Sequence, residues 1–461
     1  MNRRIAVIGG GLTGLAAACH LRQLGAEPLL LESSPRVGGA IRSSREGDWL
    51  HEAGPNTLLA NTPVVTEFLA HLGLASRTLT PPPTARHRYV LRGGVPRALP
   101  GSPPALLGGN FFSWRSKLRL LREPFVARAA PGADESIADF TRRRLGREFL
   151  DYAVNPFVAG INAGDPARLS VRHGFPKLHA LEQRHGSLLR GLLAARRTAP
   201  RGGIVSFPEG LEEIPRAAAA LLGPAALALE AGITALAPAP GDQWLVRWGT
   251  PSGAHEEIFS RILIALPAAA AARLPLPAAA ARALAILPTI SHPPVASVFL
   301  GFTRAAVAHP LDGFGLLVPA IESRRTLGTL FSSSLFPGRA PADHVALTTF
   351  VGGTRQPENA LLDDEALIAL VLADLVTSLG VTGAPRFARI VRWPRAIPQY
   401  EVGYARFEAA FAAAERACPG LHFGGHARDG VALGACIESG QRLARLSALQ
   451  ARDPKSIISS S

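Results

Sequence analysis

One arrangement near the N-terminus limits the fold of this chain more than any other. A short apolar run at 5–8 leads into the glycine-rich segment 9–14 (GGGLTG), and helix-favouring residues follow it. A second apolar run at 28–31 ends in Glu32, which lies 18 residues after Gly14. This order predicts a strand, a glycine turn, a helix and a second strand, which is the βαβ unit that binds dinucleotides.

Each glycine of this G-x-G-x-x-G pattern has a separate task. Gly9 allows a tight turn, Gly11 lets the backbone approach the phosphates, and Gly14 lets the helix pack closely on the strand. The free N–H groups and the dipole of the helix N-terminus attract a pyrophosphate, and Glu32 is placed to bind a ribose hydroxyl. We expect no secretory signal peptide, because the glycine turn interrupts the apolar stretch.

A second glycine pair, Gly38 and Gly39, follows the acid almost at once, with Arg36 and Arg42 beside it. Glycines at this point let backbone amides reach the pyrophosphate, and the arginines supply positive charge. The pair resembles the second dinucleotide element of FAD-dependent amine oxidases, phytoene desaturases and protoporphyrinogen oxidases. We therefore expect the cofactor to be FAD rather than NAD.

Size and composition indicate a globular protein of two or three domains. The chain has 461 residues, of which 47% are hydrophobic and 18% are charged. No run of 18 or more apolar residues is free of charges and helix breakers, so we expect no transmembrane helix. The three cysteines, Cys19, Cys418 and Cys436, are too few and too scattered for a disulfide framework or a metal site, which suits the reducing cytoplasm.

The net charge of +14 is carried almost entirely by arginine. It is compatible with nucleic acid, an anionic membrane surface or an acidic substrate as a partner. We expect no nucleic acid partner, because the chain has no recognition motif and no basic stripe interleaved with aromatic residues. Residues 106–119 mix Phe, Trp and Leu with three cations, which is typical either of a segment at a membrane surface or of a buried amphipathic helix with a basic face.

The order of patterns along the chain predicts three domains, one of them discontinuous. Residues 1–84, 199–267 and 393–461 are expected to form a Rossmann-like FAD-binding domain. Residues 85–198 are helical and basic in pattern, and we expect a membrane-associating domain there. Residues 268–392 carry alternating apolar runs and predict a substrate-binding domain on a mixed sheet. The predicted fold class is therefore α/β.

Several stretches outside the dinucleotide elements share a pattern with one flavoprotein family. They are NPFVAG at 155–160, AGDP at 163–166, FPEGL at 207–211, FGLLVP at 314–319, LGTLFSS at 327–333, AIPQY at 396–400 and FGG at 423–425. Over residues 3–445 the chain resembles the oxygen-dependent protoporphyrinogen oxidases, a family that includes the related coproporphyrinogen III oxidases. At Ala40, Asn56 and Tyr404 the chain differs from the residues usual in that family. These differences put in question how closely the flavin environment and the pocket shape match those of the family.

The resemblance implies which residues bind the cofactor and the substrate. The implied FAD contacts are Gly9, Gly11, Thr13, Gly14, Glu32, Ser33, Gly38, Gly39, Gly54, Ile233, Trp393, Val431, Ala432 and Leu433. The last three are expected to begin a helix that runs to about residue 445. The substrate would lie in a slot lined by Gly315, Leu317, Phe336 and Phe350. Arg88 would hold a propionate, and Gly160 would lie near the reacting ring. No side chain is expected to act as an acid or base, because the flavin takes the hydride.

The implied reaction is the six-electron oxidation of protoporphyrinogen IX to protoporphyrin IX in heme biosynthesis, with O2 as the acceptor and H2O2 as a product. The alternative is oxidation of coproporphyrinogen III to coproporphyrin III. More distant alternatives are an amine oxidase, a carotenoid desaturase and a non-catalytic porphyrin- or heme-binding flavoprotein. The expected location is the cytoplasm, with peripheral contact to the anionic inner face of the cell membrane. A homodimer is compatible with the sequence, which does not determine the oligomeric state.

Overall fold

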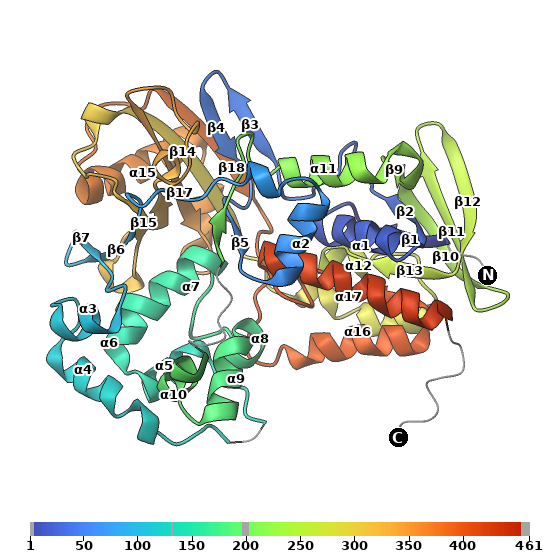
Figure 1. Cartoon of the computed structure of the whole chain (residues 1–461), viewed down its shortest axis with the longest axis horizontal. Helices are drawn as coiled ribbons and strands as arrows, with labels where there is room; N and C mark the ends of the chain where they lie inside the picture. Colours follow the sequence, from blue (N-terminus) through green and yellow to red (C-terminus); the bar gives the residue numbers. More distant parts are fainter. Residues whose placement is uncertain (1–3, 131, 196–201, 453–461) are drawn as a thin grey trace.

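The computed structural model describes residues 4–130, 132–195 and 202–452. Two large sheets lie apart from each other, one parallel and one mixed, with a group of helices beside them (Figure 1). A few residues of the predicted domains lie outside the described residues, namely 1–3, 131, 196–201 and 453–461.

The parallel sheet has its strands in the order β19-β13-β1-β2-β9. These strands come from distant parts of the chain: β1 (Arg4–Ile8), β2 (Glu27–Leu31), β9 (Leu227–Ala228), β13 (Arg261–Ile264) and β19 (Leu421–Phe423). A parallel sheet is covered on both faces, which explains why its strands are mainly apolar, with charged residues only at the first positions of β1, β2 and β13 and a histidine in β19. In β1, Ile5 and Val7 join one core cluster, and Ala6 and Ile8 join the other.

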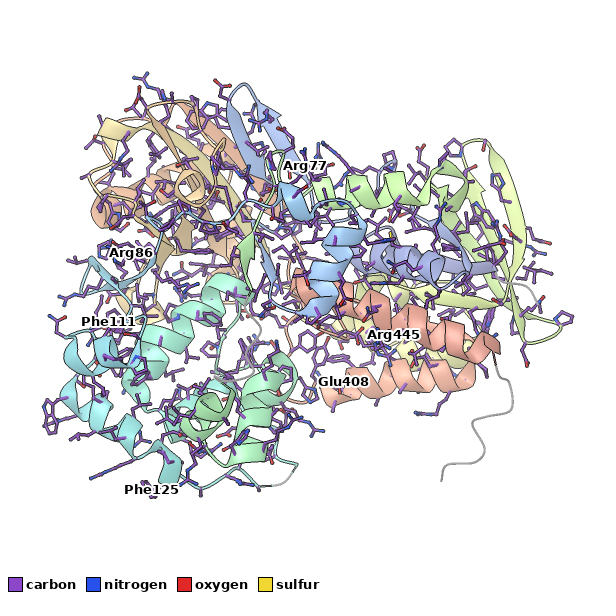
Figure 2. All side chains as sticks on the ribbon, viewed as in Figure 1. Arg77, Arg86, Phe111, Phe125, Glu408 and Arg445 are labelled. Atoms are coloured by element: carbon purple, nitrogen blue, oxygen red, sulfur yellow. The ribbon has the colours of Figure 1, made fainter. Side chains whose placement is uncertain are left out.

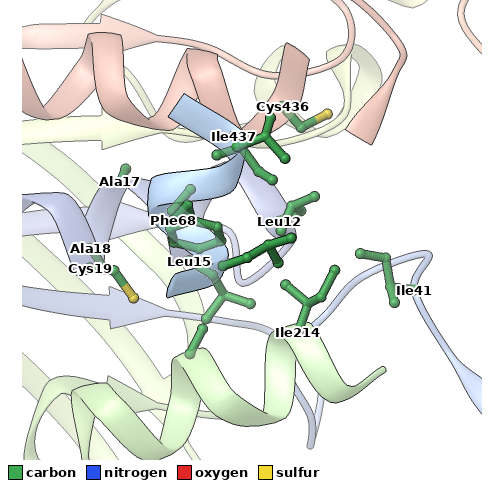
Figure 3. Packing of buried hydrophobic residues seen from close by; sticks show 14 of the residues in the cluster. Leu12, Leu15, Ala17, Ala18, Cys19, Ile41, Phe68, Ile214, Cys436 and Ile437 are labelled. Carbon is green, nitrogen blue, oxygen red and sulfur yellow. The ribbon is translucent and has the colours of Figure 1, made fainter. Parts of the chain in front are cut away.

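Helices cover both faces of this sheet. The face of Ile5 and Val7 packs against α1 (Leu12–Gln23), α2 (Pro63–His71), α11 (Glu213–Leu222) and α17 (Leu433–Arg452). Figure 3 shows Leu15, Phe68 and Ile437 from three of these helices in one cluster. The other face packs against α12 (Ala268–Ala271), α13 (Ala278–Leu284), α16 (Ala405–Ala417) and the antiparallel sheet of β10 (Gly232–Ala239), β11 (Gln243–Thr250) and β12 (Gly253–Phe259).

The mixed sheet has its strands in the order β18-β14-β17-β16-β15-β6-β7. Their bounds are β6 (His87–Arg92), β7 (Val95–Ala98), β14 (Val295–Thr303), β15 (Gly313–Leu317), β16 (Thr326–Leu330), β17 (His344–Gly352) and β18 (Phe387–Trp393). β15 and β6 pair in parallel, whereas the other neighbours are antiparallel. One face packs against α15 (Asp364–Leu379) in an apolar cluster. The other face carries the site described below.

The hairpin of β3 (Ser43–Glu46) and β4 (Trp49–Glu52) reaches from the parallel-sheet part to the mixed sheet. Its Trp49 ring stacks on Phe387 of β18, with the ring centroids 5.4 Å apart. A second short pair, β5 (Leu58–Ala60) and β8 (Gly203–Val205), joins chain segments on either side of the helical region.

The segment predicted as helical, 85–198, begins with β6 and β7, which extend the mixed sheet. The apolar alternation of these strands is short, and β6 is stabilised by pairing with the distant strand β15, while β7 pairs with β6. Helices follow: α3 (Pro103–Gly108), α4 (Trp114–Leu121), α5 (Ile137–Arg144), α6 (Arg147–Phe149), α7 (Asn155–Asn162), α8 (Val171–Gly174), α9 (Pro176–His185) and α10 (Leu188–Ala195). Serine side chains cap the N-termini of α3, α4, α5, α8 and α10, at Ser102, Ser113, Ser136, Ser170 and Ser187.

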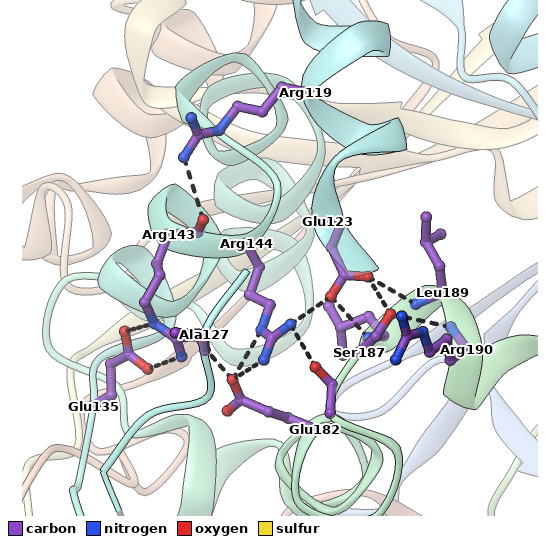
Figure 4. Close-up of polar contacts among 12 residues, drawn as sticks. Arg119, Glu123, Ala127, Glu135, Arg143, Arg144, Glu182, Ser187, Leu189 and Arg190 are labelled. Carbon is purple, nitrogen blue, oxygen red and sulfur yellow. Dashed lines mark hydrogen bonds and ion pairs between the residues drawn. The ribbon is translucent and has the colours of Figure 1, made fainter. Parts of the chain in front are cut away.

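A buried ion network holds these helices together (Figure 4). The guanidinium of Arg144 is fully buried, and it donates to Glu123 and Glu182 over 2.8 Å each. Glu123 also accepts the backbone N–H of Leu188, the first residue of α10, over 2.8 Å. Buried charges need such partners, because removing one leaves the other uncompensated. The network therefore fixes the segment after α4 to α9 and α10.

The architecture confirms the predicted α/β fold class, with a Rossmann-like parallel sheet and a second part built on a mixed sheet. Across 4–130, 132–195 and 202–452, no helix combines the length and the apolar character that crossing a bilayer requires. Membrane association of the helical region stays a prediction.

Candidate active site

The glycine turn joins β1 to α1, and its three motif glycines differ in their surroundings. Gly9 has a φ of +109°, and a Cβ there would lie 2.7 Å from the carbonyl oxygen of Ala265. A Cβ on Gly14 would lie 1.9 Å from the carbonyl oxygen of Gly9. A Cβ on Gly11 would meet no atom of the described residues within 4 Å. Packing therefore requires glycine at 9 and 14, whereas Gly11 faces free space in front of α1.

The N-terminus of α1 suits an anion. Gly11 is the N-cap residue, none of the described side chains caps the helix, and its first turn holds no acidic residue. The first N–H groups of a helix need partners from outside it, so they are available to a pyrophosphate. Thr13 lies in this turn, and its Oγ1 is close to Gly425 of the C-terminal segment: a Cβ on that glycine would lie 3.7 Å away.

The second glycine pair folds over the first turn. The N–H of Gly38 donates to the carbonyl oxygen of Gly10 over 2.7 Å, and a Cβ on Gly39 would lie 3.3 Å from the Cα of Gly11. Arg36 donates to three carbonyl oxygens of its own turn, so its guanidinium stabilises the turn. The two glycine elements thus form one backbone cradle, which fits a dinucleotide.

Glu32 lies at the carboxyl end of β2, beside the same turn. Its Oε2 accepts the N–H of Gly10 over 2.6 Å, and its Oε1 accepts the N–H of Ser34 over 2.8 Å. Ser33 is exposed, with its hydroxyl 3.5 Å from the same Oε1. The carboxylate is therefore next to the cradle, where a ribose hydroxyl binds in this type of fold.

Other predicted FAD contacts connect the cradle to the mixed sheet. Trp393, at the end of β18, donates from Nε1 to the carbonyl oxygen of Ala53 over 2.8 Å. This bond ties the loop of Gly54 to the mixed sheet. The loop is tightly packed at Gly54 itself, where a Cβ would lie 2.2 Å from the carbonyl oxygen of Ala40. Ile233 of β10 and Val431 both pack at the edge of the second core cluster of the parallel sheet.

The C-terminal helix begins two residues later than predicted, at Leu433. Ala432 lies just outside it and accepts the N–H of Cys436 over 3.0 Å. Gly430 has a φ of +120°, which bends the chain before this point. The predicted contacts at Val431, Ala432 and Leu433 still surround the N-terminus of α17.

Two tyrosines hold the loop 424–430 that precedes this helix. The ring of Tyr404 stacks on that of Tyr400 at 4.2 Å between centroids, and its hydroxyl donates to the carbonyl oxygen of Ala427 over 2.7 Å. The hydroxyl of Tyr400 donates to the carbonyl oxygen of His426 over 2.8 Å. Burial raises the pKa of both hydroxyls, so they remain donors. The departure from the family pattern at Tyr404 therefore has a structural role.

Most of the predicted slot residues lie on one face of the mixed sheet. Gly315 of β15 pairs with Arg88 of β6 on one side and with Leu330 of β16 on the other. Leu317 and Phe350 both pair with the same residue of β16. Paired residues, and alternate residues along one strand, share a face of a sheet. Arg88, Gly315, Leu317 and Phe350 therefore share a face.

The helix α7 packs on this face and brings Gly160 to it. A Cβ on Gly160 would lie 2.5 Å from Cδ2 of Leu317. Phe350 packs against the cluster that includes Ala159 of the same helix. The structure thus brings Gly160, Leu317 and Phe350 together.

Arg88 and Phe336 lie away from this contact. Arg88 is exposed, and its guanidinium carbon lies 5.8 Å from the centre of the Phe314 ring. Phe336 is buried after α14 (Ser332–Leu335), in a cluster against which Leu330 packs. Leu330 pairs with Gly315 and so lies on the same face of the sheet. The sequence did not indicate it as a slot residue, although its alternation with Gly328 along β16 is a usable signal.

The chain shares its sequence pattern with known flavoproteins. The family described as flavin containing amine oxidoreductase matches residues 12–446. Protoporphyrinogen oxidase 2 of Arabidopsis thaliana is 32% identical, covering 96% of this chain and 94% of that protein. Coproporphyrinogen III oxidase of Bacillus subtilis is 27% identical, covering 95% of this chain and 97% of that protein.

Solved structures share the fold. A crystal structure of a protein from Exiguobacterium sp. 255-15, assigned as a protoporphyrinogen oxidase, has a TM-score of 0.80 at 25% identity, with 97% of this chain and 99% of that chain covered. Cyclohexylamine oxidase from Brevibacterium oxydans has a TM-score of 0.70 at 18% identity, with 98% and 99% covered, which shows the fold alone. The chain belongs to the flavin containing amine oxidoreductase family, and its cofactor is FAD.

Proposed function

We propose that this chain is a porphyrinogen oxidase of heme biosynthesis, which converts protoporphyrinogen IX to protoporphyrin IX in a six-electron oxidation that consumes O2 and releases H2O2. Relatives with this name match nearly the whole chain and support the proposal. The structural observation that carries it is the apolar face at Gly315, Leu317 and Phe350. That face belongs to the sheet whose edge strand holds the loop of Gly54.

The residues of this chain bind and orient the reactants. When bound, FAD would supply the oxidising chemistry, a two-electron acceptor for hydride in each of three rounds that O2 would reoxidise. The N–H groups at the start of α1 hold the pyrophosphate, and Arg88 binds a propionate through two parallel hydrogen bonds. Leu317 and Phe350 contact the macrocycle. Gly160, which has no side chain, lets α7 pack closely against Leu317 and so shapes the slot beside the reacting ring.

The decisive experiment follows the flavin without air. Protoporphyrinogen IX added to the FAD-loaded protein should bleach the flavin absorbance, and air should restore it with the appearance of porphyrin fluorescence and H2O2. A flavin that stays oxidised in excess porphyrinogen would contradict the proposal and favour a non-catalytic porphyrin-binding flavoprotein.

Coproporphyrinogen III is the second candidate substrate, supported by the match to the coproporphyrinogen III oxidase of Bacillus subtilis. Its additional carboxylates also suit a chain with a net charge of +14. A side-by-side assay of both porphyrinogens separates the two. A kcat/KM more than about tenfold higher for coproporphyrinogen III would assign this alternative.

The helical region presents an apolar surface that fits an anionic membrane. Trp114 and Phe125 are 65% and 82% exposed, and Leu118 and Leu121 are also exposed. Phe125 lies at the outer edge of this region in Figure 2. Arg119 holds α4 in place by donating to two carbonyl oxygens at the end of α5, and the exposed apolar side chains of α4 face into solvent. Aromatic and leucine side chains next to arginines are typical of interfacial segments.

Vesicle flotation tests this surface. The protein should float with vesicles that contain phosphatidylglycerol and much less with neutral phosphatidylcholine vesicles. Replacing Trp114 and Phe125 by Ser should abolish flotation, whereas the same change at Leu361, which is 62% exposed on the mixed-sheet part, should not. Equal flotation of all variants would contradict this surface. We infer a cytoplasmic location at the inner face of the membrane. Light scattering of the purified protein measures the oligomeric state, which the sequence does not determine.

A further inference from the structure

A small polar cavity lies where the β3–β4 hairpin meets the mixed sheet. The residues around it that matter here are Glu52, Asn56, Leu330, Phe336 and Arg339. Asn56 and Leu330 are partly exposed, while the other three are buried, so the cavity opens on the side of Asn56 and Leu330. Its free space is about 10 Å³, roughly that of one water molecule, so it admits a single carboxylate oxygen and not a pyrrole ring.

The cavity adjoins both predicted binding regions. Asn56 follows the loop of Gly54 and donates to the carbonyl oxygen of that glycine over 3.0 Å. Leu330 pairs in register with Gly315 of the substrate face, and Phe336 belongs to the predicted slot. A substrate lying on that face would therefore have the mouth of the cavity within reach of its side arms.

Arg339 is the cation of this cavity, and part of its guanidinium is unsatisfied. The residue is 3% exposed. Its Nη2 donates to the hydroxyl of Ser206 over 2.8 Å and to the carbonyl oxygen of Phe207 over 3.2 Å. No polar atom of the described residues forms a hydrogen bond with its Nη1. An unpaired N–H on a buried cation is costly, and an anion at Nη1 would remove that cost.

Glu52, the acid nearest to Arg339, is already engaged. Its Oε2 accepts the hydroxyl of Ser43 over 2.6 Å, and its Oε1 accepts the N–H of Leu211 over 2.9 Å. The distance from Glu52 Oε1 to Arg339 Nη2 is 3.9 Å, longer than a hydrogen bond. Glu52 therefore leaves Nη1 unpaired.

We propose that this cavity is a carboxylate subsite, in which Nη1 of Arg339 binds one carboxylate of the porphyrinogen while Arg88 binds another at the rim. The inference rests on the proposed function. Guanidinium groups favour carboxylates because their N–H groups match the two oxygens. The same chemistry would accept a small free carboxylate such as acetate, so the test separates these two sources.

The test measures binding of porphyrins to the FAD-loaded protein by fluorescence. Coproporphyrin III and protoporphyrin IX are compared with their methyl esters, which have the same ring and no charge. The wild type should prefer the acids. Arg339→Gln should weaken binding of the acids by roughly tenfold or more and leave binding of the esters unchanged, since a hydrogen bond to a charged group is lost. Arg282→Gln, at an exposed arginine of α13, is the matched control and should change neither.

A second variant keeps the test valid if Arg339→Gln fails to fold or to load FAD. At about pH 8, above the raised pKa of about 7 of the Glu52 carboxyl, Glu52→Gln removes a negative charge beside the subsite, so it should tighten binding of the acids several-fold and leave the esters unchanged. Loss of a fold alone cannot produce this tightening.

Two results would overturn the inference. One is an acid-to-ester preference that stays the same in Arg339→Gln and in Glu52→Gln. The other is that acetate raises the Tm of the wild type but not of Arg339→Gln while porphyrin binding is unchanged, which would assign the cavity to a free carboxylate. A wild type that binds neither acids nor esters would instead remove the proposed function itself.

Discussion

The dinucleotide cradle and the substrate face are built in opposite ways. The cradle consists of backbone, and Gly9, Gly11 and Gly14 lie within one turn of the chain. The proposed substrate face is assembled from the distant strands β6, β15, β16 and β17, with α7 packed on it, and it combines side chains such as Leu317 and Phe350 with the glycines Gly315 and Gly160. Cofactor binding therefore depends on one local turn, whereas substrate choice would depend on residues that meet only in the folded chain.

The largest effect is expected where the cradle needs empty space. Gly11→Val should abolish FAD binding, because the new side chain would fill the space in front of α1. A Cβ at this position meets no atom of the described residues within 4 Å, so the fold should tolerate it. The bound flavin is measured by absorbance, and Tm of the apoprotein reports the fold. Gly101→Val, also with open space around its Cβ, is the control. A yellow, fully loaded Gly11→Val variant would refute the placement of the pyrophosphate.

On the proposed substrate face, a side chain inserted between α7 and β15 should have the next largest effect. Gly160→Val should lower kcat/KM for the porphyrinogen by about a hundredfold with FAD still bound, since a Cβ there meets Leu317 at 2.5 Å. Adding Leu317→Ala should restore part of the activity by making room. Unchanged activity in the single variant would separate Gly160 from the site.

A smaller effect is expected at the rim. Arg88→Ala should raise KM about tenfold, with kcat and FAD content nearly unchanged, because a charged hydrogen bond to the propionate is lost. Arg86→Ala, at an exposed arginine two residues earlier, should behave as the wild type. Identical KM values for the two variants would place the propionate elsewhere.

The smallest effect concerns pH, at the hairpin between the two regions. Burial raises the pKa of Glu52 to about 7 from an ordinary 4.5. Between these pH values the folded protein holds a proton that the unfolded chain releases, so this residue's contribution to stability falls as pH rises through that window. The Gln variant has no such pH-dependent loss. The Tm of Glu52→Gln minus the Tm of the wild type should therefore rise by a few degrees between about pH 5 and about pH 7.5. Exposed Glu67→Gln should show no such trend, and a flat difference for Glu52→Gln would contradict the expectation.

The sequence predicted the cradle better than the rest, for a physical reason. A glycine turn depends on its own residues and near neighbours, so Gly9, Gly14 and Glu32 could be interpreted locally. The strands β6 and β7 could not, because β6 is stabilised by pairing with the distant strand β15 and β7 by pairing with β6. The cavity at Arg339 had no signal, since the hairpin and the loop after α14 meet only in the folded chain.

The parallel sheet receives its edge strand, β19, from residues 421–423, and α17 covers α1 after that. A ribosome adds about 5–20 residues per second, so the early strands wait tens of seconds for these last elements. During that interval the apolar faces of β1 and β13 lack part of their cover, and chaperones are the expected protection. A premature stop codon before residue 421 should therefore yield an aggregating fragment, not a smaller yellow protein.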